Sequence, residues 1–203
     1  MSQTEIEYIG EINKKKFDEL NQLFKAKGKF KKQKKRLSFM YFRDFIPEDI
    51  SEIKDEPVDL RFRVTNKQPE IVLKYGTFDA SHARKEISLE FKPEESEKYV
   101  DFLNCLGWKI GVIYAADTLV YEYNGIEFSL VEIKDYGYNF EAEILTDEDK
   151  IKKAKEKIEG QLKNLGLKQF DENGLNKQCN AINNKKDLQF DFSRHSFSVI
   201  KER

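Results

Sequence analysis

Cysteine and histidine are scarce in this sequence, and their scarcity excludes several kinds of site. The two cysteines, Cys105 and Cys179, stand far apart among 203 residues and form neither a disulfide framework nor a zinc-binding motif. Thiols stay reduced in the cytoplasm, so we expect a cytoplasmic protein. His82 and His195 are the only histidines, which argues against a histidine-rich metal centre or a Ser-His-Asp hydrolase.

Long apolar runs and a dominant charge are missing as well. No stretch approaches the roughly 20 apolar residues of a membrane-spanning helix, and the polar, acidic start of the chain does not resemble a signal peptide. The chain has 36 Lys and Arg against 37 Asp and Glu, a formal net charge of −1. Such a balance creates no general attraction to nucleic acid or membrane. We therefore expect neither of them as a partner. As to oligomeric state, we expect a monomer or a homodimer.

Aromatic residues, by contrast, are plentiful. The 16 Phe and 9 Tyr supply apolar surface for a core, even though 36% of the residues are charged. The length favours a single domain over residues 1–203, with 167–203 as a C-terminal extension of the same domain. Apolar residues at helical spacing predict helices at about 13–28, 93–106 and 147–165.

Short alternating runs predict eight or nine strands, and the tripeptide YNG that ends at Gly125 fits a hairpin between two of them. The basic run 29–36 is expected to be a solvated loop, and 188–200 shows strand-like alternation. Few connections are long enough for a parallel crossover. The pattern therefore predicts an α+β fold: an antiparallel closed barrel, or tunnel, of eight or nine strands with helices packed on the outside. The predicted strands lie near residues 4–12, 35–43, 59–64, 70–76, 83–91, 107–115, 118–123, 126–133 and 138–145.

Charged residues share one face on each of five of these strands. In a closed sheet such faces would point into one lumen, whereas in an open sheet they would be solvated. Carboxylates are hard ligands for Mg²⁺ or Mn²⁺, and arginine forks match phosphate oxygens. The residues concerned are Glu5, Glu7, Arg61, Arg63, Lys74, Arg84, Glu86, Glu90, Glu141 and Glu143.

The order of these motifs resembles the CYTH superfamily, the triphosphate tunnel metalloenzymes. The family's Glu-x-Glu-x-Lys strand is similar to "EIEYI", its Leu-Arg-x-Arg strand to "LRFR", and its lysine-ending strand to "IVLKYG". Its Arg-x-Glu strand is similar to "ARKEISLEF", its Leu-Gly-aromatic step to "FLNCLGW", and its closing motif to "GYNFEAE". The resemblance covers roughly residues 4–165, and it rests on the order and spacing of the motifs together.

The resemblance implies a metal-dependent phosphohydrolase that acts on tripolyphosphate, thiamine triphosphate or a nucleotide. It implies that Mg²⁺ or Mn²⁺ binds to Glu5, Glu7, Glu141 and Glu143. It places the phosphate oxygens on Arg61, Arg63, Lys74 and Arg84. Glu86 would serve as the catalytic carboxylate that orients the attacking water.

Four positions depart from the family pattern. Ile9 replaces the lysine of the first strand, Ala116 and Thr118 occupy the place of a basic pair, and Val131 that of an aspartate. Asp117 or Glu132 could fill these roles only if the alignment contained a gap.

These departures keep two further functions open. One is a class IV-type adenylyl cyclase that makes cyclic AMP from ATP, although no purine pocket is marked in the sequence. The other is a catalytically impaired module that binds a triphosphate, a nucleotide or an RNA 5′ end. The basic run 29–36 could extend such a surface toward RNA, although a run of this kind gives only weak, salt-sensitive binding.

Overall fold

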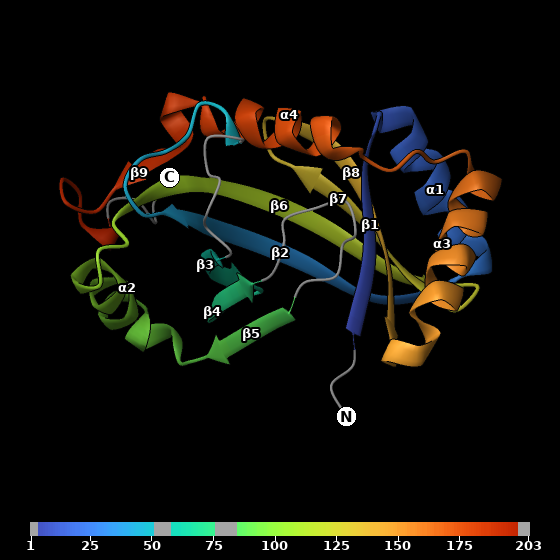
Figure 1. Cartoon of the computed structure of the whole chain (residues 1–203), viewed down its shortest axis with the longest axis horizontal. Coiled ribbons are helices and arrows are strands. Elements are labelled where there is room, and N and C mark those ends of the chain that lie inside the picture. Colours follow the sequence, from blue (N-terminus) through green and yellow to red (C-terminus); the bar gives the residue numbers. More distant parts are fainter. Residues whose placement is uncertain (1–3, 51–57, 76–84, 199–203) are drawn as a thin grey trace. The chain divides into compact units, whose positions relative to one another are not determined.

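The computed structural model describes residues 4–50, 58–75 and 85–198 (Figure 1). Its strands are β1 (Thr4–Ile12), β2 (Lys29–Phe42), β3 (Val58–Thr65), β4 (Gln68–Tyr75), β5 (Lys85–Glu90), β6 (Ile110–Tyr123), β7 (Ile126–Ile133), β8 (Gly137–Thr146) and β9 (Gln189–Asp191). Its α-helices are α1 (Lys14–Lys27), α2 (Ser96–Cys105), α3 (Ile151–Leu165) and α4 (Glu172–Asn183). Short 3₁₀ turns precede α2 at Pro93–Glu95, α3 at Glu148–Lys150 and β9 at Lys186–Leu188.

The strands form one mostly antiparallel sheet in the order β1-β8-β7-β6-β2-β3-β4-β5, and β9 pairs with β6. The predicted α+β class and the predicted strand number are confirmed. The strand order is open, with β1 and β5 at its ends among the described strands, so closure into a barrel stays a prediction. In the described part of the chain, no helix is both long enough and apolar enough to cross a membrane.

The described residues group into two compact units. The first lies within Met1–Lys35, Gly76–Lys85 and Ala116–Leu175, and the second within Arg36–Tyr75, Glu86–Ala115 and Asn176–Arg203. Strands β2 and β6 and helix α4 contribute to both units. The single domain expected over residues 1–203 stays a prediction.

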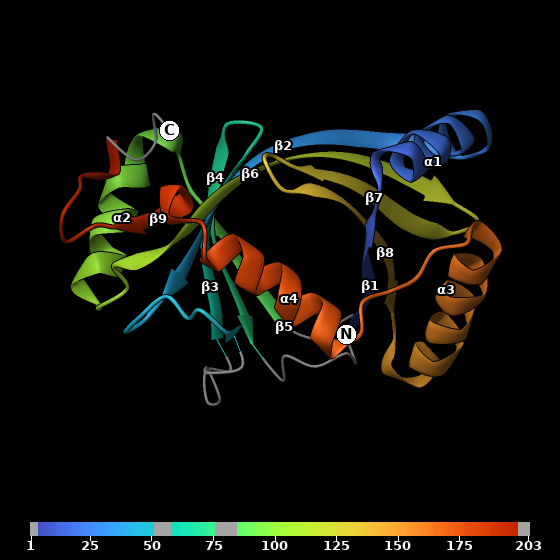
Figure 2. The ribbon, with the colours of Figure 1, turned by 90° about the horizontal axis from the view of Figure 1, so that it is seen from above.

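The core of the first unit forms where α1 and α3 pack against β1 and β8 (Figure 2). Helix α1 begins where the Asn13 side chain accepts a hydrogen bond from the backbone N–H of Lys16, as its sequence predicts. Phe24 of α1 packs against the rings of Tyr121 and Phe128. Because the helices cover the apolar face of β1, the alternate side chains of that strand lie on the other face of the sheet.

The hairpin between β6 and β7 is confirmed. Asn124 and Gly125 both have positive φ, at 54° and 68°, as a tight two-residue turn requires. Helix α3 holds this turn: Lys157 donates a hydrogen bond of 2.9 Å to the Gly125 carbonyl, and Asn124 donates one of 3.1 Å to Gln161. The turn therefore determines which residues of β6 and β7 lie opposite each other.

The second unit has an aromatic core of its own. Phe39 of β2 lies opposite Phe62 of β3, and their ring centroids are 5.4 Å apart. Phe190 and Phe197 from the C-terminal part of the chain pack on Phe39 as well. Since Phe62 faces this core, Arg61 and Arg63 lie on the opposite face of β3.

Three expectations about individual segments were wrong. The basic run 29–36 is not a loop but the first half of β2, because backbone pairing between strands does not require apolar side chains and lysine heads stay in water. The predicted strands 107–115 and 118–123 are one strand, β6, which begins at Ile110, since no turn residue interrupts it. Of the tail 188–200, only Gln189–Asp191 forms a strand in the described residues.

We predict opposite effects on stability for two glycine substitutions in the first unit. A Cβ atom at Gly10 would lie 2.3 Å from the Lys168 carbonyl oxygen and 2.5 Å from the Phe140 ring, so Gly10→Ala should destabilise the chain by about 2 kcal/mol. A Cβ atom at Gly160 in α3 meets nothing within 4 Å, so Gly160→Ala should stabilise it by about 0.5–1 kcal/mol. Urea unfolding of both variants measures these changes, and equal effects would contradict the packing described at Gly10.

Candidate functional site

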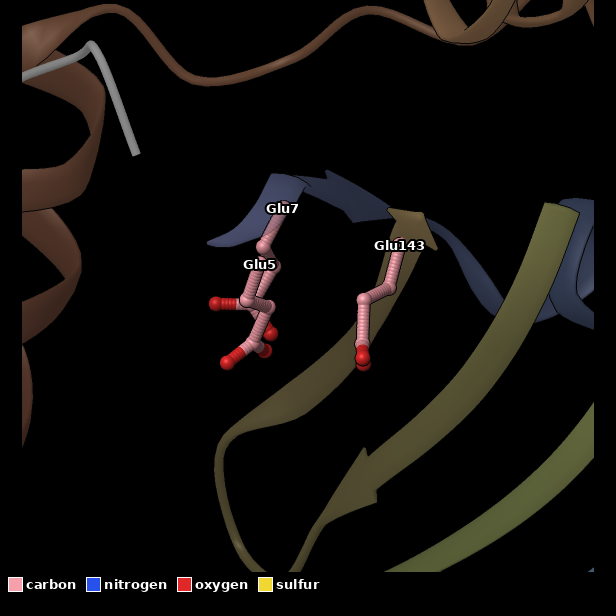
Figure 3. A group of neighbouring side chains, drawn as sticks. All are labelled: Glu5, Glu7 and Glu143. Atoms are coloured by element: carbon pink, nitrogen blue, oxygen red, sulfur yellow. The ribbon is translucent and has the colours of Figure 1, made fainter. Parts of the chain in front are cut away.

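Three carboxylates of the first unit meet on one face of the sheet. Glu5 and Glu7 come from β1 and Glu143 from β8, and one carboxylate oxygen from each lies within 4.8 Å of the others. Glu7 lies directly opposite Glu143 in the antiparallel pairing of the two strands. Figure 3 shows that all three side chains extend to the same side. The strand register therefore brings together three of the four acidic residues singled out as metal ligands.

The fourth predicted ligand, Glu141, lies on the same face but outside this tight group. It stands two residues before Glu143 on β8, opposite Ile9 on one side and Ser129 on the other. Its side chain is half-buried. A metal role for Glu141 stays a prediction.

A row of four glutamates crosses the sheet at the level of Glu143. Glu7 on β1 is opposite Glu143 on β8, which is opposite Glu127 on β7, which is opposite Glu122 on β6. The sequence reasoning missed Glu122 and Glu127. The hairpin signal could have found them, because a two-residue turn at Asn124 and Gly125 places these two glutamates opposite each other.

The crowding of carboxylates changes the acidity of Glu143. Burial raises the pKa of its carboxyl, and repulsion from Glu5, Glu7 and Glu127 raises it further, to about 7. The Lys34 ammonium lowers this pKa in part. A carboxyl in this environment gains from either a proton or a cation.

Two lysines of the basic run reach the carboxylate face. Lys31 Nζ lies 3.3 Å from Glu122 Oε2. Lys34 is half-buried, unlike its exposed neighbours Lys32 and Lys35, and its charge acts on Glu143. The expectation that this run is only a solvated loop was therefore wrong. The run is part of strand β2, and two of its lysine side chains interact with the glutamates.

The four departures from the family pattern also lie on this face. Ile9 is opposite Glu141, Thr118 is opposite Val131, and Ala116 follows the same alternation on β6. None of the four carries a charge. Asp117 and Glu132, the two acidic residues that a gap would have recovered, pair with each other on the other face and are exposed.

The second unit holds Arg61 and Arg63, and each of them is paired with a carboxylate. Arg61 donates from Nε and Nη2 to the two carboxylate oxygens of Asp59, at 2.7 and 2.6 Å. Both side chains are largely buried, with 17% and 16% of their surface exposed. Alternation along β3 places Asp59, Arg61 and Arg63 on one face.

Arg63 and Lys74 form a second network with two glutamates. Arg63 lies 3.2 Å from Glu70 and 3.1 Å from Glu86, and Lys74 lies 3.1 Å from Glu86. Burial favours the neutral form of Glu86, but the charges of Lys74 and Arg63 outweigh it and hold the pKa of that carboxyl below its ordinary value. Glu86 is therefore an ionised partner of two cations in this structure, and its catalytic role stays a prediction.

The remaining predicted phosphate ligand, Arg84, lies outside the described residues. Sequence reasoning also missed the carboxylates Asp59 and Glu70, which neutralise the arginines. Alternation could have indicated both, since Asp59 precedes Arg61 by two residues and Glu70 lies opposite Arg63.

The cluster of three glutamates in the first unit fits a hard divalent cation. Its donors are all carboxylate oxygens, the class that Mg²⁺ and Mn²⁺ prefer. Three half-buried carboxylates held within 4.8 Å repel one another, and a cation between them would relieve that repulsion. Glu5, Glu7 and Glu143 are the residues that would hold the ion.

Comparison with known proteins identifies the fold. No family model and no curated protein matches the sequence. The PH1819 protein of Pyrococcus horikoshii OT3 superposes with a TM-score of 0.65 at 26% identity, over 82% of this chain and 93% of that one. A provisionally assigned adenylate cyclase from Vibrio parahaemolyticus matches over 100% of both chains, with a TM-score of 0.61 and 12% identity.

A third similar structure is the HpAC1 protein of Hippeastrum, a provisionally assigned adenylyl cyclase with dominant triphosphatase activity. It covers 99% of this chain and 96% of its own, with a TM-score of 0.56 and 16% identity. At 12% and 16% sequence identity, the similarity to these two structures shows the fold alone. The chain therefore shares its fold with these structures, and that fold is consistent with the resemblance of its sequence to the CYTH superfamily.

Proposed function

We propose that the chain binds a triphosphate together with a divalent cation and hydrolyses it. The observation that carries this proposal is the group of Glu5, Glu7 and Glu143, whose carboxylate oxygens lie within 4.8 Å of one another. Mg²⁺ or Mn²⁺ bound there would neutralise phosphate charge and polarise a phosphoryl oxygen. Hydrolysis in place of binding alone is supported by the fold shared with HpAC1, in which triphosphatase activity is dominant.

The cations of the second unit supply the complementary chemistry. Carboxylate oxygens lie 2.6–3.2 Å from the side-chain nitrogens of Arg61, Arg63 and Lys74. These side chains are therefore already positioned. A phosphate group offers two oxygens to the arginine fork, as a carboxylate does, and it would take the place of these carboxylates. A metal triphosphate carries a cation, which suits the carboxylates of the first unit, and oxyanions, which suit the cations of the second unit, each considered by itself.

Glu86 is the proposed catalytic carboxylate. The pKa of its carboxyl is lowered by Lys74 and Arg63 against the effect of burial, so it is ionised at neutral pH. An ionised carboxylate accepts a hydrogen bond and orients a water, but it is a weak base. Positioning and charge neutralisation would then supply most of the rate.

Two alternatives have specific support. A cyclase acting on ATP is favoured by the adenylate cyclase assignment of the Vibrio parahaemolyticus structure. An impaired binding module is favoured by the uncharged residues at Ile9, Ala116, Thr118 and Val131, all on the carboxylate face. Lys31 and Lys34 place two positive charges on that face, and this observation weakens the second alternative.

We predict that tripolyphosphate with Mn²⁺ stabilises the chain and is hydrolysed. A ligand at about 100 times its dissociation constant adds roughly 2.7 kcal/mol to the free energy of unfolding. Phosphate release from tripolyphosphate, thiamine triphosphate and ATP measures hydrolysis, and cyclic AMP formation from ATP identifies a cyclase. Stabilisation by the ligand without release of phosphate or formation of cyclic AMP would favour the catalytically impaired binding module.

Lys74→Gln should weaken this stabilisation, because it removes one proposed phosphate contact. The exposed Lys98→Gln on α2 changes the charge equally and should have no effect. Arg61→Ala is a poorer test, since it would leave the Asp59 carboxylate largely buried and unpaired.

We predict that Glu5→Gln combined with Glu7→Gln removes the response to Mn²⁺ without loss of stability. In the metal-free chain the double substitution relieves repulsion with Glu143, so the melting temperature should stay the same or rise slightly. Thermal melts with and without Mn²⁺ measure both effects. Glu11→Gln, an exposed position on the same strand, serves as the control. A double variant that is strongly destabilised without metal would show that these carboxylates are partners of buried cations.

We predict that the stability of the metal-free chain falls as the pH rises toward 7. The pKa of Glu143 is raised from 4.5 to about 7 by burial and by its acidic neighbours. Between these values the folded chain retains a proton that the unfolded chain has released, so raising the pH favours unfolding. Glu143→Gln should flatten this part of the profile and stabilise the chain at pH 8 by about 1 kcal/mol after solvent screening.

Urea unfolding at several pH values measures the profile. Glu156→Gln, an exposed position on α3, should leave the decline unchanged. A wild-type profile that rises between pH 5 and 7 would contradict the crowding described at Glu143.

A further inference from the structure

Ser38 is a polar residue in an unusual setting. It lies on β2 directly opposite Arg63 of β3, so the two side chains share the face that carries the proposed phosphate ligands. Its relative exposure is 0%, yet its hydroxyl oxygen has no hydrogen-bond partner among the described residues. No role was attached to Ser38 by the motifs of the sequence.

Arg63, opposite Ser38, has a side-chain N–H donor without an acceptor among the described residues. Its relative exposure is 6%, and its Nη2 donates a hydrogen bond of 3.1 Å to Glu86. Its Nε lies 3.2 Å from Glu70 Oε1 but makes no hydrogen bond with it or with any other described residue. Two buried donors on neighbouring strands, one hydroxyl and one guanidinium N–H, therefore both lack an acceptor.

Such an arrangement is costly unless a ligand uses it. A buried polar group without a partner loses its hydrogen bonds to water and gains nothing in return. The chain satisfies a comparable hydroxyl elsewhere: Ser96, at 7% exposure, donates a hydrogen bond of 2.7 Å to the Pro93 carbonyl. An alanine at position 38 would avoid the free-energy cost of an unpaired buried hydroxyl. The presence of a serine there therefore suggests a functional role.

We propose that Ser38 is a further ligand-contacting residue, whose hydroxyl donates a hydrogen bond to the phosphate oxygen that also accepts from Arg63 Nε. A phosphate oxygen has enough lone pairs to accept from both donors, and a charged acceptor makes both bonds strong. This inference rests on the proposed function, since it requires that the chain binds a phosphate-containing ligand.

The inference also says what changes on binding. Without ligand, Glu70 and Glu86 neutralise Arg63, and the Ser38 hydroxyl is left over. The phosphate replaces these carboxylates as the partner of the guanidinium, and in doing so it brings an acceptor to Ser38. The hydroxyl thus contributes to the bound state only.

The test compares Ser38→Ala with Ser96→Ala, using tripolyphosphate with Mn²⁺ as the probe. Ser38→Ala should raise the dissociation constant about tenfold, the loss expected for one hydrogen bond to a charged group. Its melting temperature without ligand should be unchanged or higher, because an unsatisfied hydroxyl is removed. Ser96→Ala should show the opposite pattern, with a lower melting temperature and unchanged affinity.

Isothermal titration with tripolyphosphate measures affinity, and thermal melts without ligand measure stability. Equal affinity of wild type and Ser38→Ala would overturn the role of Ser38 and leave the proposed function standing. A lower melting temperature of Ser38→Ala together with unchanged affinity would assign the hydroxyl to a structural water. Wild type that binds no polyphosphate would overturn the proposed function and this inference with it.

Discussion

Repulsion between like charges is the constraint on which the first unit depends. Four adjacent strands place Glu7, Glu143, Glu127 and Glu122 side by side, an arrangement that lowers the stability of the metal-free sheet. The cost is borne by the aromatic core on the other face, where α1 and α3 pack against β1 and β8. Strong packing on one face thus compensates for the repulsion between carboxylates on the other.

The second unit solves the opposite problem by internal pairing. Arg61 and Arg63 would be expensive to bury alone, and each is paired with a carboxylate of its own strand or of the neighbouring strand. The two units therefore differ in their electrostatics. In the first, neighbouring carboxylates crowd one another and raise the pKa of Glu143, whereas in the second Arg61 and Arg63 are neutralised by carboxylates.

Alternation in the sequence predicted much of this arrangement. It placed Glu5 and Glu7 on one face and Arg61 and Arg63 on one face, because a strand has a strict period of two. It did not predict which strands are neighbours, and so it missed the pairing of Glu127 with Glu143 and of Glu70 with Arg63. The polarity of residues 29–36 predicts a loop, and this prediction was wrong. Hydrogen bonds to neighbouring strands stabilise a polar strand as well as an apolar one.

The turn between β6 and β7 has a consequence for how this protein can vary. A change of one residue in the length of the turn at Asn124 and Gly125 would shift the register of the hairpin and rotate Glu127 to the helix-covered face. The anchoring of the turn by Lys157 and Gln161 makes such a shift still harder to absorb. An insertion at this loop should therefore disrupt the row of glutamates, although the loop contains none of them.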